Sequence, residues 1–476
     1  MSRVRWIALG VIATGLLMSV LDGSIVTVAM PAMQDDLGLS PAGLSWVVNA
    51  YLIAFGSLLL LAGRLGDLIG RKRMFLIGTA VFTLASLLAG AANSPTVLIV
   101  ARFLQGVGSA MSAAVSLGIL VTLFTESKER AKAIAVFSFT GAAGASIGQV
   151  LGGVLTDALN WHWIFLINIP IGIAAIAVAV PVLPADRGLG LAAGADVLGA
   201  VLVTGGLMAG IYAVVTIESD GRNAALFGAL AVVLLAGFLV RQATARNPLM
   251  PLHIFRSRSV SAANLVQVLM VAALFAFQIL TALYLQKVLG YDALETGLAM
   301  LPAALTIGAV SLGVATRLNA RFGERTVLLA GLTLLTGMFL LLVRVPVEAN
   351  YVTDLLPLMF LASGFGLALP ALTTLGMSGA KADDAGLASG LFNTTQQIGM
   401  ALGVALLSTL AASRTESLSD AGQSLPAALT GGYHLAYAVG AGLLVAAFTV
   451  AAVLLRQPAR DRAIPQDAET VPAPVG

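Results

Sequence analysis

The sequence predicts an all-α polytopic membrane protein. Apolar windows of about twenty residues, the length that a helix needs to cross a bilayer, recur along nearly the whole of the 476-residue chain. Hydrophobic residues make up 58% of the chain and charged residues 10%, whereas a soluble protein of this length has about a quarter charged residues. Of the 26 Lys and Arg, 21 fall in stretches outside the apolar windows that share one side of the membrane.

The apolar windows and the stretches between them predict fourteen membrane-spanning helices. In chain order they cover residues 6–29, 43–63, 74–92, 97–122, 133–156, 163–183, 194–216, 223–243, 259–286, 294–317, 326–345, 355–378, 387–412 and 432–455. An even number of spans places both termini on the same side, and the excess of Lys and Arg marks that side as cytoplasmic. A missed or invented span in mid-chain would move every later loop to the other side and remove this asymmetry.

The predicted spans divide into two halves. The glycine- and arginine-containing stretch at 63–73 has a weaker copy at 312–325, after the tenth span. If the seventh and eighth spans are an insert, both copies follow the second span of a six-helix half, which is the arrangement of parallel repeats. We therefore expect four regions, namely an N-terminal bundle at 1–183, two inserted helices with a cytoplasmic connector at 184–258, a C-terminal bundle at 259–455 and a disordered tail at 456–476.

The two ends of the chain need separate arguments. The first apolar run superficially resembles a signal peptide, but it is too long, contains Asp22 and is followed by many further spans. We interpret it as an uncleaved first helix. The tail contains Pro, Asp, Glu and Arg without an apolar period, which is typical of disorder. The connector at 244–258 is long enough for a short interfacial helix.

The stretch 63–73 is predicted to be a short cytoplasmic loop with a gating role. Gly63 and Gly70 permit a tight reversal, and Arg71 begins a run of three cations that anchors the loop on the cytoplasmic side. Asp67 is a carboxylate at the end of a helix close to these cations. Either it belongs to a solvated turn, or it is a latch that pairs with a cation or caps a neighbouring helix in one conformation.

Two ionisable residues lie inside predicted spans and are candidates for proton coupling. An ionised carboxylate at Asp22 is costly in hydrocarbon, so it should pair, face a cavity or take up a proton. Arg102 is the one cation that we place at depth, and Gln105 lies on the same helical face. A guanidinium keeps its charge and can change partner when a nearby carboxylate is protonated. The alternatives are a structural carboxylate and an arginine that joins helices.

Further polar residues within the spans are candidates for lining a substrate cavity. Those in the first half are Asn49, Gln105 and Gln149, and those in the second half are Asn264, Gln267, Gln278, Tyr284, Asn393, Gln396 and Gln397. The alternative for each is a hydrogen bond between helices. Glycines spaced for close packing of the fifth helix form a separate group, made up of Gly144, Gly148, Gly152 and Gly153.

Composition excludes several function classes. The absence of Cys removes disulfides, thiolate metal sites and thiol nucleophiles, and the three His residues are too scattered to suggest a metal site. No Walker-type phosphate loop and no cytosolic domain long enough for an ATPase occur, so we expect no cofactor and an ion gradient as the energy source, if any. The Ser/His pair or facing carboxylates of an intramembrane protease are not recognisable, so we do not expect an enzyme. The basic pI reflects topology rather than nucleic-acid binding.

The chain resembles the fourteen-helix drug–proton antiporter branch of the major facilitator superfamily. The resembling segments are Leu21–Val26 continuing to Pro31, Trp46 with Tyr51, the 63–73 stretch, 102–110 on the fourth helix, 144–153 on the fifth, 161–172, and 284–302. The resemblance implies the major facilitator fold, a latch function for Asp67, and an association of the 102–110 stretch with proton coupling. It also identifies 144–153 as the antiporter motif.

Three residues depart from the pattern of this branch. Gln149 stands where the antiporter motif normally has Pro, which bears on transport direction, and Gln396 stands where an Arg is usual, which removes a cationic cavity contact. His162 replaces a common Arg near the outer surface.

The predicted function is proton-coupled efflux of drug-like or antibiotic molecules by alternating access, in the cytoplasmic membrane of a bacterium. The expected partners are a small-molecule substrate, protons and the lipid bilayer, with a monomer as the working unit. The alternative is an uptake symporter or facilitator for a polar small solute, and it would accumulate its substrate on energisation.

Overall fold

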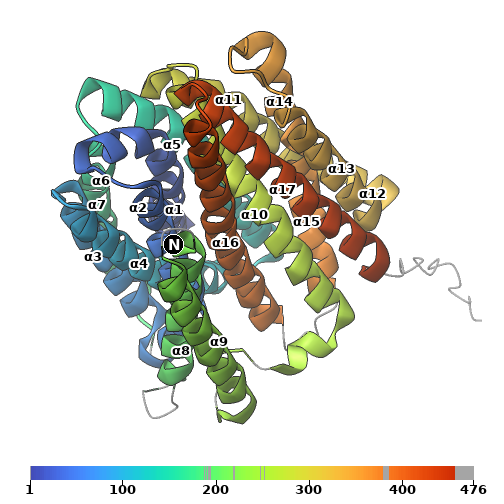
Figure 1. The fold of residues 1–476 in the computed structure, drawn as a ribbon. Coiled ribbons are helices and arrows are strands. Elements are labelled where there is room, and N and C mark those ends of the chain that lie inside the picture. The colour runs from blue at the N-terminus through green and yellow to red at the C-terminus, as the bar shows by residue number, and fades with distance from the viewer. Residues whose placement is uncertain are drawn as a thin grey trace, which may run out of the picture.

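A computed structural model describes residues 2–186, 188, 190, 195–217, 220–246, 248–250, 252–378 and 385–455. All regular elements in this part of the chain are helices (Figure 1). The described residues contain thirteen helical stretches, each formed by one element or by two or three consecutive elements, that are long and apolar enough to cross a membrane. The prediction of an all-α polytopic membrane protein is confirmed.

The helices follow one another with short connections. The first seven are α1 (Ser2–Leu37), α2 (Pro41–Ile69), α3 (Arg71–Gly90), α4 (Pro95–Leu123), α5 (Ser127–Ala158), α6 (Trp163–Leu166) and α7 (Asn168–Val182). The middle of the chain holds α8 (Val197–Thr216), α9 (Gly221–Thr244) and a short 3₁₀ helix η2 (Leu252–Arg256). The remainder holds α10 (Arg258–Lys287), α11 (Ala293–Ala309), η3 (Val310–Val314), α12 (Ala315–Phe322), α13 (Glu324–Leu342), η4 (Tyr351–Leu355), α14 (Leu356–Leu361), α15 (Ser363–Ser378), α16 (Ala385–Asp420) and α17 (Leu425–Leu454).

Some predicted spans correspond to more than one element. The sixth consists of α6 and α7, which are separated at Ile167. The tenth consists of α11, the π-helical turn η3 and α12, and the twelfth consists of the π-helical turn η4 with α14 and α15. Other helices are longer than predicted, and α16 extends to Asp420. A bilayer-length apolar window sets a minimum, and polar ends of a helix continue beyond it.

Helix starts follow from local capping. The side chain of Ser40 accepts a hydrogen bond from the N–H of Gly43, and Pro41 follows in the first turn of α2. Ser94 and Pro95 start α4 in the same way. A hydroxyl at the cap satisfies a free backbone N–H, and proline in the first turn has no N–H to lose.

The 63–73 stretch differs from its prediction as a loop. Helix α2 runs on to Ile69 and α3 begins at Arg71, so only Gly70 lies outside the helices. Gly70 has φ = 100°, a conformation that other residues rarely adopt. Its N–H bonds to the carbonyl of Gly66 at 3.0 Å. This bond is the last one of the α2 hydrogen-bond ladder, and the chain reverses at Gly70 directly after it.

The helices from the two ends of the sequence occupy opposite sides of the view in Figure 1. Helices α1–α7 lie on the left and α10–α17 on the right, with the α8–α9 hairpin at the lower front. The largest buried apolar cluster runs from Ala262 to Leu455, and a second is formed mainly by α1 and α2. The two sides meet where α1 packs on α10, α2 on α16 and α5 on α11. The predicted tail at 456–476 lies outside the described residues.

Candidate functional site

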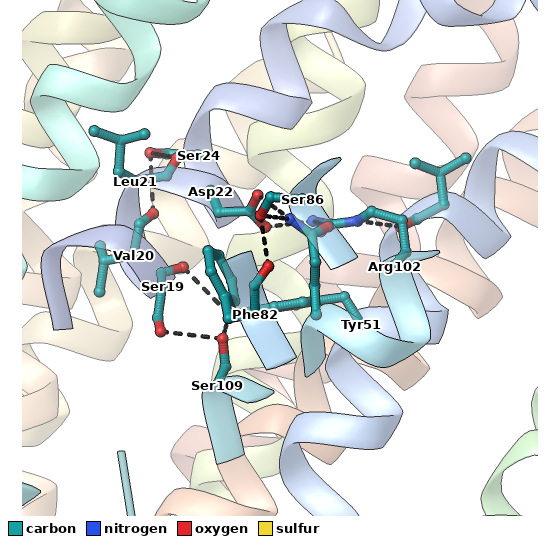
Figure 2. A network of polar contacts seen from close by, with 12 residues as sticks. Ser19, Val20, Leu21, Asp22, Ser24, Tyr51, Phe82, Ser86, Arg102 and Ser109 are labelled. Carbon is teal, nitrogen blue, oxygen red and sulfur yellow. Dashed lines mark hydrogen bonds and ion pairs between the residues drawn. The ribbon is translucent and has the colours of Figure 1, made fainter. Parts of the chain in front are cut away.

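A buried ion pair joins α1 to α4. A terminal nitrogen of Arg102 donates a hydrogen bond to the carboxylate of Asp22, and their side chains are 1% and 0% exposed (Figure 2). The Nε of Arg102 also donates to the carbonyl of Val47 on α2, at 2.9 Å. The guanidinium therefore holds three helices together. A charge pair in this setting is stable only when its remaining hydrogen-bonding groups are also satisfied.

Gln105 completes the partners of the pair. Its Oε1 accepts a hydrogen bond from Arg102 at 2.9 Å, and its Nε2 donates to Asp22 at 3.0 Å. The same Nε2 lies 2.9 Å from the hydroxyl of Ser86 on α3. Gln105 is thus a neutral residue that contacts both charges, and its position one turn after Arg102 brings it to the same face of α4. Sequence reasoning did not identify Ser86.

Tyr51 separates the ion pair from a large cavity. Its ring lies under the guanidinium of Arg102, 4.5 Å from ring centroid to Cζ, which is a cation–π distance. Its hydroxyl lies 3.1 Å from the Oγ of Ser109 and donates to the carbonyl of Ser19 at 3.3 Å. Tyr51 lines the cavity, whereas neither member of the pair does.

The cavity lies between the two sides of the fold. Its volume is about 1150 Å³, and its wall is formed by helices α1, α2, α4 and α5 from one side and α10, α11, α15 and α16 from the other. Four predicted cavity residues line it, namely Gln278, Asn393, Gln396 and Gln397. The remaining wall is largely apolar and includes Phe55, Phe275 and Phe365. A concave, mostly apolar site with a few amides suits an amphipathic small molecule.

The cavity reaches one face of the protein. We call it the basic face, because the ends of α2 and α9 bring Arg64 and Arg246 there. Asp67 lines the same entrance.

On the opposite face, three contacts join the two sides of the fold. Lys287 pairs with Asp35 at 3.1 Å, Gln286 donates to the carbonyl of Val28 at 3.0 Å, and the N–H of Leu294 donates to Asp157 at 2.6 Å. The structure is therefore open at the basic face and closed opposite.

The other predicted cavity residues do not line the cavity. Asn264 accepts from Thr395 and Gln267 donates to the carbonyl of Phe392, so both join α10 to α16. The hydroxyl of Tyr284 donates to the carbonyl of Pro346. Gln105 belongs to the ion-pair network described above. Asn49 and Gln149 are buried with at least one amide atom lacking a hydrogen-bond partner.

The predicted gating residues form a compact group on the basic face. Asp67 accepts hydrogen bonds from Arg71 at 3.2 and 3.4 Å. A second carboxylate, Asp186, caps α3 by accepting from the backbone N–H groups of Arg71 and Lys72, at 2.6 and 3.2 Å. Sequence reasoning missed Asp186, since it lies more than a hundred residues from the helix that it caps. Gly63 lines the cavity, and a Cβ at Gly70 would come within 2.9 Å of the Asp186 carbonyl oxygen.

The fifth-helix glycines allow two close helix contacts. Gly144, Gly148 and Gly152 face α1, where a Cβ would come within 3.0 Å of Leu17, Ser24 or Ile25. Gly153 faces α11, and a Cβ there would lie 2.5 Å from the Cα of Leu294. One helix thus packs backbone to backbone on both sides of the fold.

Comparison with known proteins fits this architecture. The sequence profile described as the Major Facilitator Superfamily matches residues 12–404. The chain belongs to the major facilitator superfamily. This membership, the many membrane-length helices and the bacterial relatives make it a multi-pass inner-membrane transporter of small molecules.

Relatives of this chain bear names of resistance and export proteins. It is 38% identical over 461 residues to the puromycin resistance protein pur8 of Streptomyces alboniger, covering 95% of this chain and 91% of the relative. It is 37% identical over 466 residues to the cephamycin export protein CmcT of Amycolatopsis lactamdurans, covering 96% and 93%.

Solved structures share the fold at low sequence identity. A POT family peptide transporter in an auto-inhibited form superposes with a TM-score of 0.68 at 16% identity, covering 96% of this chain and 98% of that one. The POT family transporter PepTSo superposes with a TM-score of 0.67 at 15% identity, covering 93% and 97%. These likenesses show the fold alone.

Proposed function

We propose that the protein is a proton-driven exporter of drug-like molecules that works by alternating access. The names of its relatives, which include puromycin resistance and cephamycin export proteins, support a drug-like substrate. The large, mostly apolar cavity supports the same class. We further propose that the basic face is cytoplasmic, with both termini on that side, and that a monomer is the working unit.

The observation that carries proton coupling is the buried pair of Asp22 and Arg102 behind Tyr51. When Asp22 takes up a proton, the carboxylate loses its charge and Arg102 keeps the Val47 carbonyl and Gln105 as partners. The contact between α1 and α4 then weakens, because a charge-assisted hydrogen bond becomes a neutral one. In this scheme protonation shifts the balance between the two openings of the cavity.

Alternating access needs two groups of helices that move as units. We propose residues 1–183 and 259–455 as these units, connected through 184–258. The contacts of Lys287 and Leu294 with the opposite side close the outer face in the present state. Opening that face requires these contacts to break, while Asp67 and Arg71 help to close the basic face.

The proton gradient supplies enough energy for this task. One proton that moves inward across 100 mV releases about 2.3 kcal/mol, which corresponds to roughly 50-fold accumulation. A pH that is lower outside than inside adds to this value.

The test uses purified protein in liposomes. We expect Asp22→Asn to abolish proton-coupled efflux while the protein still inserts and binds substrate. The control is Asp220→Asn, which removes an exposed helix-capping carboxylate outside the cavity and should leave coupling intact. Unchanged coupling in Asp22→Asn would remove Asp22 from the mechanism. Substrate that accumulates in cells on energisation, rather than leaving them, would favour the uptake alternative.

A further inference from the structure

Two buried amides in the outer half of the protein have hydrogen-bonding atoms without partners. Asn49 on α2 is 0% exposed, and Gln149 on α5 is 3% exposed. Both amide atoms of Asn49 and the Oε1 of Gln149 lack a hydrogen-bond partner within the part of the chain that the structure describes. An unpaired buried amide is unfavourable, because the group has given up its hydrogen bonds to water and gained none in return.

Both amides lie where the two sides of the fold meet. Asn49 is seven residues, about two helical turns, before Gly56, so the two residues share one face of α2. A Cβ at Gly56 would come within 2.6 Å of the Cβ of Gln397, which places this face against α16. Gln149 is one turn before Gly153, on the face of α5 that packs on α11.

The two positions belong to the closed part of these helix contacts. Helix α2 starts on the closed face and reaches the basic face at Asp67, so Asn49, in its third turn, is nearer to the closed face. Helix α5 ends on the closed face, where Asp157 accepts from the N–H of Leu294, and Gln149 is about two turns before Asp157. Opening of the outer face therefore separates the helices around both amides.

Gln286 on α10 shows the opposite arrangement on the closed face. Its Nε2 donates to the carbonyl of Val28 on α1 at 3.0 Å, so this amide has its partner only while the two sides are together. A paired amide across this contact favours the closed outer face, and an unpaired one disfavours it. The sign of the effect depends on pairing and not on the type of residue.

We propose that Asn49 and Gln149 are positioning residues of the transport cycle that promote opening of the outer face, because their amides gain hydrogen bonds only when the helices around them separate. The proposal rests on the proposed alternating access. In the outward-open state, water and the polar groups of a departing substrate bond to both amides. The open state thus gains interactions that the closed state lacks, and the balance between the two states shifts towards opening.

Two further buried amides provide matched controls. Asn168 and Gln267 are both 0% exposed and also have amide atoms without a partner among the described residues. Asn168 is one turn before Gly172, where a Cβ would meet the hydroxyl of Thr83 on α3, and Gln267 joins α10 to α16. Each lies within one side of the fold, so opening of the outer face does not separate the helices around it.

The experiment measures how fast a small membrane-impermeant thiol reagent, added outside, labels a single Ser24→Cys in the cavity wall. It uses the full-length protein in intact cells treated with a protonophore, so that no proton gradient biases the two states. Asn49→Leu and Gln149→Met remove the amides with little change in size. Each should slow labelling about fivefold, which corresponds to about 1 kcal/mol.

The other variants separate this effect from a general effect of removing an amide. Gln286→Met should speed labelling, because it removes a paired amide from the closed face. Asn168→Leu and Gln267→Met should leave the labelling rate unchanged, whatever they do to thermal stability. If Asn49→Leu fails to insert, Asn49→Ala removes the same amide without adding bulk, and the same holds for alanine at Gln149.

Two results would overturn the proposal. The first is labelling of the Asn49 and Gln149 variants at the wild-type rate. The second is an equal slowing by the Asn168 and Gln267 variants. A third result has a different meaning, since a cavity that the reagent never reaches from outside, in the wild type or in Gln286→Met, would reject alternating access itself. Because labelling is measured without a gradient, the first two outcomes are independent of proton coupling.

Discussion

The carboxylate of Asp157 near the end of α5 accepts a 2.6 Å hydrogen bond from the backbone N–H of Leu294 in the first turn of α11. This bond joins the two sides of the fold on the closed face. The start of a helix carries free N–H groups and a partial positive charge, so a carboxylate there is favourable. Asp292 and Glu295 form a capping box at the same helix start, and Asp157 adds the contact that crosses between the two sides.

We predict that Asp157→Ala shifts the protein towards the state that is open on the outer face. The substitution removes the acceptor for Leu294 without adding bulk. Because the chain has no Cys, a single Ser24→Cys in the cavity wall reports this opening through a membrane-impermeant thiol reagent added outside. Labelling should increase in Asp157→Ala and stay constant in Asp220→Ala. Equal labelling in both variants would show that Asp157 does not hold the outer face closed.

Gly297 on α11 gives a second prediction about the same face. A Cβ there would lie 2.5 Å from the carbonyl oxygen of Gln149 on α5, so Gly297→Ala must separate the two helices and should also increase labelling from outside. Gly308 on the same helix has no atom within 4 Å of its added Cβ, and Gly308→Ala should leave labelling unchanged. The prediction fails if the two alanine variants behave alike.

The ion pair of Asp22 and Arg102 should show strong coupling in stability. Arg102→Met leaves the carboxylate buried without its partner, which in general costs about 3–5 kcal/mol. The double variant Asp22→Asn with Arg102→Met removes both charges and should unfold at a higher temperature than Arg102→Met alone. Thermal unfolding in detergent measures this difference. A double variant that is less stable than Arg102→Met would contradict the role of an uncompensated charge.

Asp196 should make stability depend on pH in the acidic range. Burial acts to raise the pKa of Asp196, but hydrogen bonds from Arg241, the Gly199 N–H and Gln242 outweigh it and lower the pKa below its ordinary value. A lowered pKa means that the ionised form stabilises the fold above the unfolded pKa, about 3.9, and that this contribution is lost as pH falls through the folded value. The stability gap between wild type and Asp196→Asn should therefore be constant near neutral pH and narrow below about pH 4. If this difference in stability instead widens on acidification, the pKa of Asp196 is raised in the folded protein and not lowered.

The sequence alone identified the apolar windows that form helices and their order along the chain, and it identified the residues of the ion pair. A membrane-spanning window is a local property of the sequence, because each one must be apolar over the thickness of the bilayer regardless of its neighbours. Asp22 and Arg102 stood out for a related reason, since charges in hydrocarbon are costly wherever they occur. Membership of the superfamily followed from the same local stretches.

Only the tertiary structure decided which polar residues face the cavity and which residues join distant segments. Gln278 lines the cavity, whereas Gln267 on the same helix donates a hydrogen bond to α16. Both are glutamines within one apolar span, so the sequence does not distinguish their roles. The contacts of Asp186 with α3 and of Asp157 with α11 span more than a hundred residues. The physical reason is that a polar group in a membrane must find a partner, and the packing of helices, rather than the local sequence, determines which partner comes within reach.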